Sequence, residues 1–416
     1  MIQQETKQRE IRKFMIMLSV VNLALFAVTC RGMVRSYNTT MLALSYEYGF
    51  TSRSLLGTLY HLLDAVLPLD LIDYRAVVAT AYVATILFVL FVEYFLYRCL
   101  RCCEGEMVKY GEYLALILSL CLVSTFSFPY NFFRVDIFMI LVSLLGVLCL
   151  VKERAQWLVV PLSALGVMFH QGYVFMYFNL ILVLLFYRAL SWWKEDRRKA
   201  RRYGLLFALS FLVGSVLFLW FEFFSRSNGA AFFDTIKSEA EKLSYDGIYH
   251  STLLYHEVLG IDLASTEEEF SRVNAVQILM CGIVCLPMLV FGVRFFAGLI
   301  KKAKGASEKW KYLAVALGAA TILPDFLLKI DYGRWMAAVV VYYVGIVLAL
   351  LAMKDPIMET QVRESGERLI QRPGIALWIM VVILLLPFLD VNIDPFFRHL
   401  GSIVNKNFLH WYEPMR

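Results

Sequence analysis

The sequence has little charge for its length: 18% of its 416 residues are Asp, Glu, Lys or Arg, whereas 60% are hydrophobic. A soluble domain of this size cannot bury that much apolar surface, whereas a bilayer supplies an apolar solvent for it. The sequence also lacks a P-loop, a GxGxxG motif after a strand, an HExxH motif and a GxSxG motif. The sequence therefore carries none of the usual signatures of nucleotide-binding proteins, zinc peptidases or serine hydrolases.

The cysteines indicate neither a disulfide framework nor a metal site. They lie in or beside apolar stretches, and none lies in the long polar loop 224–274, so we expect buried thiols. Cys99, Cys102 and Cys103 form a cluster, but no second CxxC motif or histidine pair completes a zinc site. We therefore expect no metal and no other cofactor.

The net charge of +6 does not indicate nucleic acid binding, because the basic residues form short runs between apolar segments. This pattern is typical of cytoplasmic loops in membrane proteins, so we expect no nucleic acid partner. The first apolar run, 14–30, follows four basic residues but precedes no AxA cleavage site. We interpret it as a retained first helix and not as a signal peptide.

Hydropathy predicts an all-α polytopic integral membrane protein, in which residues 1–416 form a single transmembrane domain of about eleven helices. The predicted spans are 14–30, 76–97, 112–128, 135–151, 156–170, 172–190, 204–223, 275–297, 312–328, 335–353 and 374–389. Several of them are shorter than the roughly 20 residues that cross a bilayer.

The basic residues predict the orientation of these helices. With a cytoplasmic amino terminus, 26 of the 40 Lys and Arg residues fall in cytoplasmic segments, as the positive-inside rule requires. Three longer regions then lie outside. We expect 31–75 to form amphipathic interfacial helices, 224–274 to form an acidic loop over the outer face, and the tail 390–416 to carry interfacial aromatic residues.

Ionisable residues at the edge of a bilayer are costly, so they are the first candidates for function. Eight of them fall at the outer ends of the predicted helices: Arg53, Arg134, Asp136, His170, Asp325, Lys329, Asp331 and Arg334. Three arginines and a histidine at one level predict a basic pocket at headgroup depth, where guanidinium groups match phosphate. A lipid diphosphate presents its phosphates there, and Asp136, His170 or Asp331 could deprotonate an attacking sugar hydroxyl.

Four of these residues also have a simpler interpretation. Arg53 could extend to lipid headgroups, and His170 with Gln171 could form only a polar turn between two helices. Asp331 and Arg334 are three residues apart and could neutralise each other.

The segment Asn131–Arg134 precedes a long apolar hairpin with a short turn at Lys152–Arg154. Phe169 and His170 follow at the outer end of the second predicted helix of this hairpin. This pattern resembles bacterial polysaccharide polymerases of the Wzy-like and EpsG-like families, in which an arginine opens one helix and a histidine ends the next outward one. The later segment Asp331–Trp335 is similar to their second arginine site. Gln171 departs from the pattern, which has a small hydroxyl residue after the histidine.

The resemblance implies a metal-independent glycosyltransferase with a GT-C-like helical core in the bacterial inner membrane. Such an enzyme transfers a glycan from undecaprenyl diphosphate to an acceptor sugar at the outer face. Arg134 and Arg334 would hold the diphosphate with help from Arg53, and Asp136, His170 or Asp331 would activate the acceptor. The expected partners are a lipid-linked oligosaccharide and the bilayer, with a chain-length regulator or a flippase as further candidates.

Three other functions remain open. A GT-C transferase that uses a polyprenyl-monophosphate sugar would depend on an acid in the first external loop, Asp64, Asp70 or Asp73. A lipid or solute transporter would need a polar path, whereas the span centres are mostly Leu, Val, Phe and Ala, with Glu93 and Asn179 among the few exceptions. A non-catalytic scaffold would tolerate neutral residues at the arginine positions.

Overall fold

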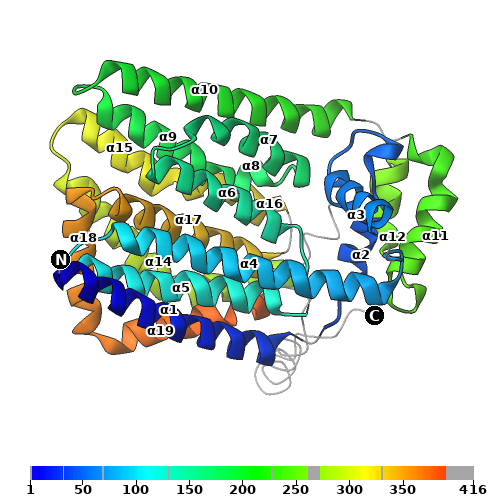
Figure 1. The fold of residues 1–416 in the computed structure, drawn as a ribbon, viewed down its shortest axis with the longest axis horizontal. Coiled ribbons are helices and arrows are strands. Elements are labelled where there is room, and N and C mark those ends of the chain that lie inside the picture. Colours follow the sequence, from blue (N-terminus) through cyan, green and yellow to red (C-terminus); the bar gives the residue numbers. More distant parts are fainter. Residues whose placement is uncertain are drawn as a thin grey trace.

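The computed structural model describes residues 2–30, 32–67, 70–129, 131–225, 228–260, 272–328 and 331–389. Within these ranges every regular element is a helix, and the long helices run side by side as one bundle (Figure 1). The predicted interfacial tail 390–416, Lys329 and part of the acidic loop, 261–271, lie outside the described residues.

The helices fall into three groups by length and position. The six longest are α1 (Ile2–Thr29), α4 (Tyr74–Cys102), α5 (Met107–Ser127), α10 (Arg197–Leu219), α14 (Arg272–Lys302) and α17 (Tyr332–Ala352). Shorter bundle helices are α6 (Asp136–Val151), α7 (Val159–Phe169), α8 (Tyr173–Met176), α9 (Phe178–Trp192), α15 (Ala306–Leu317), α16 (Leu323–Leu328), α18 (Pro356–Ile370) and α19 (Pro373–Leu385). At one end lie α2 (Ser36–Leu42), α3 (Ser54–Val66), α11 (Phe233–Leu243), α12 (Ser251–Leu254) and the π-helix η6 (Tyr255–Leu259).

Each of the eleven predicted spans coincides with helix in the structure. Six helices are long and apolar enough to cross a membrane, or seven if α18 and α19, which bend by 101°, count as one broken span. Helices α6 and α9 have only 16 and 15 residues, and 312–328 is divided by a 3₁₀ turn, η7 (Gly318–Ile322). The structure thus shows a polytopic helical protein, while the number eleven does not follow from helix length.

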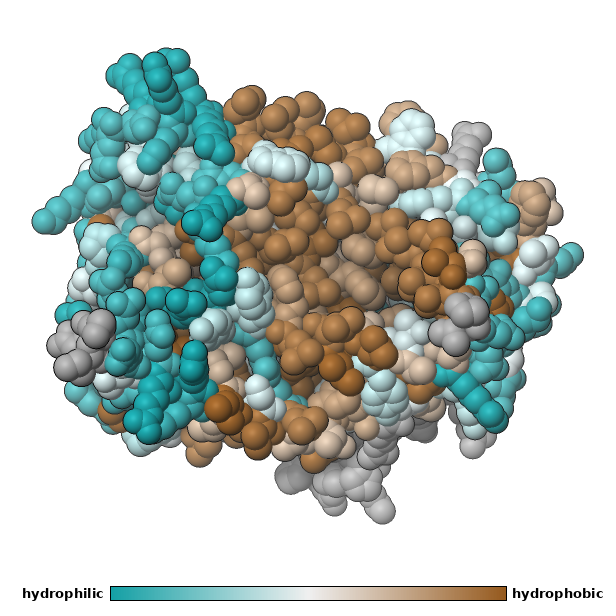
Figure 2. All heavy atoms as spheres, in the orientation of Figure 1, coloured by the Kyte–Doolittle hydropathy of each residue, from teal (hydrophilic) through white to brown (hydrophobic). Residues whose placement is uncertain are grey.

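Burial differs sharply between the centre and the rim of the bundle. The most apolar 18-residue window of α17 is 83% buried, whereas those of α1, α10 and α14 are 17%, 22% and 22% buried. The outer helices expose large apolar side chains, among them Leu23, Leu87, Leu212 and Val293. Figure 2 shows these surfaces as an apolar band between two hydrophilic ends. Such a band requires an apolar solvent, so the protein is a multi-pass membrane protein.

The segments predicted to be cytoplasmic meet at one end of the bundle, which we call the basic end. It comprises 2–13, 98–110, 152–154, 188–202, 294–311 and 354–372. Contacts between these segments include Lys7 with the carbonyl oxygen of Cys103, Arg188 with Glu153 at 2.8 Å, Lys302 with Glu364 at 2.6 Å, and Lys354 with Glu104. The group containing α2, α3, α11 and α12 lies at the opposite end (Figure 1).

Glu93, an ionisable residue within a predicted span, takes part in helix packing. Its carboxylate accepts hydrogen bonds from Ser19 Oγ and Asn22 Nδ2 on α1, both at 2.7 Å. Asn22 Oδ1 in turn accepts from Ser119 Oγ on α5 at 2.9 Å. Polar contacts of this kind join helices in an apolar solvent, so these contacts account for Glu93 without a transport path.

Helix α3 is held closely against the chain segment that precedes it. A Cβ atom on Gly57 would lie 1.8 Å from the carbonyl oxygen of Leu44, so only glycine allows this approach. Leu55, Leu56 and Tyr60 are buried, whereas the leucines on the other face are exposed. This two-sided pattern agrees with the amphipathic helix expected within 31–75.

Candidate functional site

Two arginines and two aspartates form an ion-pair network at the opposite end, where α6 and α17 begin. Arg134 donates to Asp331 Oδ2 at 2.8 Å, and Arg334 donates to the same oxygen at 2.6 Å. Arg334 also donates to Asp136 Oδ2 at 3.1 Å, while Arg134 Nε lies 3.9 Å from that oxygen. Tyr177 donates to the other oxygen of Asp136 at 3.2 Å. The two carboxylates therefore bridge two guanidinium groups that are 200 residues apart in the chain.

The turn before α6 sets the direction of Arg134. Phe133 has a positive φ of 62°, which is costly for a side chain with a Cβ atom. Asn131 stabilises the turn, because its carbonyl oxygen accepts from Arg134 N and its side-chain oxygen accepts from the Arg134 guanidinium, both at 3.1 Å. Asp331 directly precedes α17, so its carboxylate lies at the start of that helix beside Arg334.

A second cluster joins the start of α3 to the end of α7. Arg53 Nε donates to His170 Nε2 at 3.1 Å, and its guanidinium pairs with Glu257 from η6. Gly172 N donates to His170 Nδ1 at 2.8 Å. A neutral imidazole has one acceptor nitrogen, so only one of these two contacts is a hydrogen bond at a time. This arrangement suits a histidine that positions Arg53 better than one that takes a proton from a substrate.

Arg53 has a positive φ of 68° at the start of α3. The backbone is therefore in the left-handed region at Arg53 itself and at Phe133, the residue before Arg134. Such strain persists only where the surrounding structure compensates for it, and it is frequent at functional sites.

The two clusters are neighbours in space. Burial lowers the pKa of the Arg53 guanidinium, as does the charge of Arg334, but Glu257, Tyr37 and Glu222 together raise it above its ordinary value. The Tyr37 ring lies 5.3 Å from the Arg134 guanidinium carbon, and its hydroxyl also influences Arg53. The exposed fractions of the Arg53, Arg134 and Arg334 side chains are 9%, 8% and 11%. Three nearly buried guanidinium groups thus share one region.

His250, which directly precedes α12, borders the same region. Its ring lies edge-on to the Tyr37 ring, with the centroids 5.4 Å apart. Burial lowers the pKa of His250 below its ordinary value, and the positive charge of Arg134 acts in the same direction, against a backbone hydrogen bond. An additional positive charge is therefore disfavoured beside Arg134.

Among the residues that the structure describes, each arginine of the site contacts at least one carboxylate. The three arginines contact three carboxylates, those of Asp136, Asp331 and Glu257. The sequence predicted a basic pocket, whereas the described side chains form an arginine–carboxylate network. The carboxylates contact only some of the five N–H donors of each guanidinium, so an incoming phosphate would compete with them for these donors.

The structure brings together all six residues that were predicted to bind or react with substrate. It adds Glu257, Tyr37 and Tyr177, which the sequence did not reveal. Glu257 belongs to the predicted acidic loop, but nothing in the sequence links that residue to Arg53. Tyr37 and Tyr177 are two of 23 tyrosines and have no distinguishing pattern.

The acids of the first loop have structural contacts of their own. Asp64 Oδ1 accepts from Leu71 N at 2.7 Å, and Asp73 caps α4 by accepting from Arg75 N at 2.8 Å. Asp325 lies on α16 and is partly buried. Among the described residues no group of three or more His, Cys, Asp and Glu side chains is arranged to hold a metal ion.

Comparison of the chain with protein-family models, with curated proteins and with solved structures returned no match. The geometry of the site and the resemblance of its residues to the polysaccharide polymerase pattern are therefore the grounds for a proposed function.

Proposed function

We propose that the protein is a membrane glycosyltransferase of the polysaccharide polymerase type, which joins undecaprenyl-diphosphate-linked glycan units at the outer face of the bacterial inner membrane. In this proposal the chain crosses the membrane eleven times, with a cytoplasmic amino terminus, and the basic end faces the cytoplasm. The observation that carries the proposal is the meeting of Arg53, Arg134 and Arg334, from distant parts of the chain, at the end opposite the basic end.

The arginines would bind the leaving group. The acceptor hydroxyl oxygen attacks the anomeric carbon, the bond from that carbon to the diphosphate breaks, and the diphosphate departs with the bonding electrons. Arg134 and Arg334 stabilise its negative charge through paired N–H donors, and Arg53 contributes from the adjacent cluster. The hydroxyl proton passes to a carboxylate, for which Asp331 and Asp136 are the candidates.

The network offers a reason for the base to act only when substrate is present. Asp331 accepts from both Arg134 and Arg334. A diphosphate that takes these donors would release the carboxylate, and a carboxylate without guanidinium partners accepts a proton more readily than a paired one. Binding of the leaving group would thereby prepare the base.

The proposal is tested by transfer in vitro. Purified protein in nanodiscs receives lipid-linked glycan extracted from the host, and released undecaprenyl diphosphate is measured. Arg334→Ala should lower the release at least a hundredfold, because it removes a charged donor to the leaving group, which typically contributes about 3 kcal/mol. The matched control is Arg294→Ala, at the basic end, which should release undecaprenyl diphosphate as the wild type does. Equal release by Arg334→Ala and the wild type would refute the assignment.

The monophosphate-sugar transferase is the second candidate, and it makes a different demand. It needs a catalytic acid in the first loop, yet Asp64 and Asp73 each accept a hydrogen bond from a backbone N–H group. Loss of transfer in Asp70→Asn with retention in Asp331→Asn would favour it over the polymerase.

A further inference from the structure

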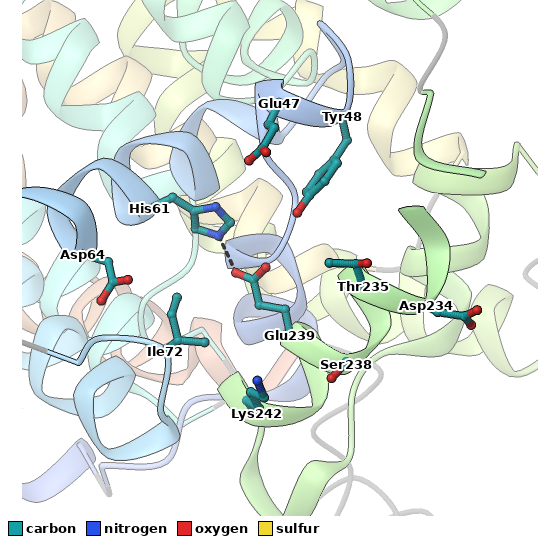
Figure 3. A pocket seen from close by; sticks show the side chains of 10 residues that line it. All are labelled: Glu47, Tyr48, His61, Asp64, Ile72, Asp234, Thr235, Ser238, Glu239 and Lys242. Atoms are coloured by element: carbon teal, nitrogen blue, oxygen red, sulfur yellow. Dashed lines mark ion pairs between the residues drawn. The ribbon is translucent and has the colours of Figure 1, made fainter. Parts of the chain in front are cut away.

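An open pocket of about 630 Å³ lies between α3 and α11 at the end of the bundle that carries the arginines (Figure 3). Its volume falls in the range of small-molecule sites, roughly 300–1,000 Å³. Ile72 is the one aliphatic side chain among the ten residues that line it. A wall this polar is unsuited to a lipid tail and suited to a ligand with many hydroxyl groups.

The chemistry of the wall matches a neutral saccharide. Asp64 Oδ1 and Glu239 Oε1 already have partners, Leu71 N and His61, but the second oxygen of each carboxylate can accept from a sugar hydroxyl, and Lys242 and the Ser238 hydroxyl supply donors. Tyr48 also lines the pocket, and its largely buried ring packs against Phe232 with the centroids 5.5 Å apart.

The charge of the pocket excludes phosphate. Four carboxylates line it against the single ammonium of Lys242 and the imidazole of His61: those of Glu47, Asp64, Asp234 and Glu239. The three arginines of the candidate site lie elsewhere at the same end. Because like charges repel, a sugar diphosphate would place its phosphates among the arginines and only its sugar here.

The same two stretches of chain build the pocket and the Arg53–Glu257 pair. Helix α3 begins beside Arg53 and carries His61 eight residues later, about 12 Å along the helix axis at 1.5 Å per residue. The segment 228–260 supplies both Glu239 in the pocket and Glu257, the partner of Arg53. It is joined to the first stretch by a hydrogen bond from Asn228 N to the carbonyl oxygen of Tyr48 at 2.8 Å.

Contacts join the two walls of the pocket and fix their relative position. His61 Nε2 lies 2.5 Å from Glu239 Oε1, an ion pair that Figure 3 shows crossing from α3 to α11. Thr39 and Ser244 share a hydrogen bond of 2.6 Å between α2 and the chain directly after α11. These links fix the two walls before a ligand arrives, which lowers the entropic cost of binding.

We propose that this pocket is a saccharide-binding subsite, which takes the uncharged sugar portion of the substrate while the arginines hold the phosphates. The identity of the occupant as a lipid-linked glycan rests on the proposed function, whereas the sugar-binding chemistry is independent of it.

Saturation-transfer NMR tests the subsite without any reaction. The full chain is placed in nanodiscs free of glycoside detergent and mixed with free glucose, galactose, rhamnose, N-acetylglucosamine and chitobiose. Ring protons of at least one of these sugars should receive saturation, and sodium pyrophosphate should not displace it. Ser238→Trp, which fills the pocket from an exposed position, should reduce the transfer at least fivefold. Lys237→Trp, on the same helix but outside the pocket lining, is the matched control and should leave it unchanged.

The result that overturns the subsite is saturation of none of the five sugars, or equal saturation with Ser238→Trp and the wild type. Failure of the proposed function looks different. If Arg334→Ala releases undecaprenyl diphosphate normally while Ser238→Trp loses sugar binding, the subsite stands and the transferase assignment fails. If Arg334→Ala is inactive while Ser238→Trp binds sugar normally, the transferase assignment stands and the subsite fails.

Discussion

Asp136 is more deeply buried than Asp331, the other carboxylate that bridges Arg134 and Arg334. Its exposed fraction is 0%, and it accepts from Arg334 at 3.1 Å and from Tyr177 at 3.2 Å. Asp136→Asn keeps the size of the side chain but removes the charge. We therefore expect a loss of stability that does not come from a cavity.

The size of this loss follows from the geometry. Two unit charges about 3 Å apart attract by about 5 kcal/mol at an effective dielectric constant of about 20. The asparagine oxygen still accepts a neutral hydrogen bond worth about 1 kcal/mol, and Arg334 retains its second partner, Asp331. A net destabilisation of about 3 kcal/mol is expected, in the range measured when buried ion pairs lose one partner, and it corresponds to roughly a hundredfold change in the unfolding equilibrium.

The assay is reversible unfolding in mixed micelles, followed by tryptophan fluorescence, for Asp136→Asn, Arg334→Met and the double variant. Because the two side chains are in contact, the double variant should be less destabilised than the sum of the single variants by about 1–3 kcal/mol. Additive effects, or a loss below about 0.5 kcal/mol for Asp136→Asn, would refute the reasoning.

Three further predictions concern other parts of the molecule. Gly57→Ala should displace α3, because its Cβ would lie 1.8 Å from the carbonyl oxygen of Leu44, and limited proteolysis should show earlier cleavage in that region than in the wild type. Glu93→Leu should weaken the packing of α1 on α4 by about 1–2 kcal/mol in the same unfolding assay, whereas Glu93→Gln should retain most of it. Burial opposes protonation of His61, but the hydrogen bond and charge of Glu239, together with the backbone of Leu42 and the charge of Glu47, raise the pKa of His61. The stabilisation from this pair is therefore complete below about pH 6.5 and lost as the pH rises through the raised pKa, and His61→Gln should abolish that pH dependence of unfolding.

The helices could be predicted because long apolar runs are a local property of the sequence. The shorter elements were harder, since α6 and α9 have 16 and 15 residues and composition alone does not separate a short span from a buried helix. The break between α15 and α16 at Gly318 was missed for a related reason. Gly318 lies against the hydroxyl of Tyr342, a contact between distant residues that hydropathy cannot reveal.

The candidate site was predictable only in part. Arg134, His170 and Arg334 lie at helix ends, so the predicted order and direction of the helices were sufficient to place them at the same end of the bundle. Their carboxylate partners depend on tertiary structure: Arg53 pairs with Glu257, about 200 residues away, and no local pattern connects the two. For this reason the sequence predicted a basic pocket where the structure has an arginine–carboxylate network.

The most direct measurement of the central claim is the glycan phenotype of strains that carry Arg134→Ala or Arg334→Ala at normal protein levels. Our account predicts accumulation of lipid-linked repeat units and loss of polymer in both strains, because each variant would lack one of the guanidinium groups that bind the leaving diphosphate. Normal polymer in both strains would contradict the account.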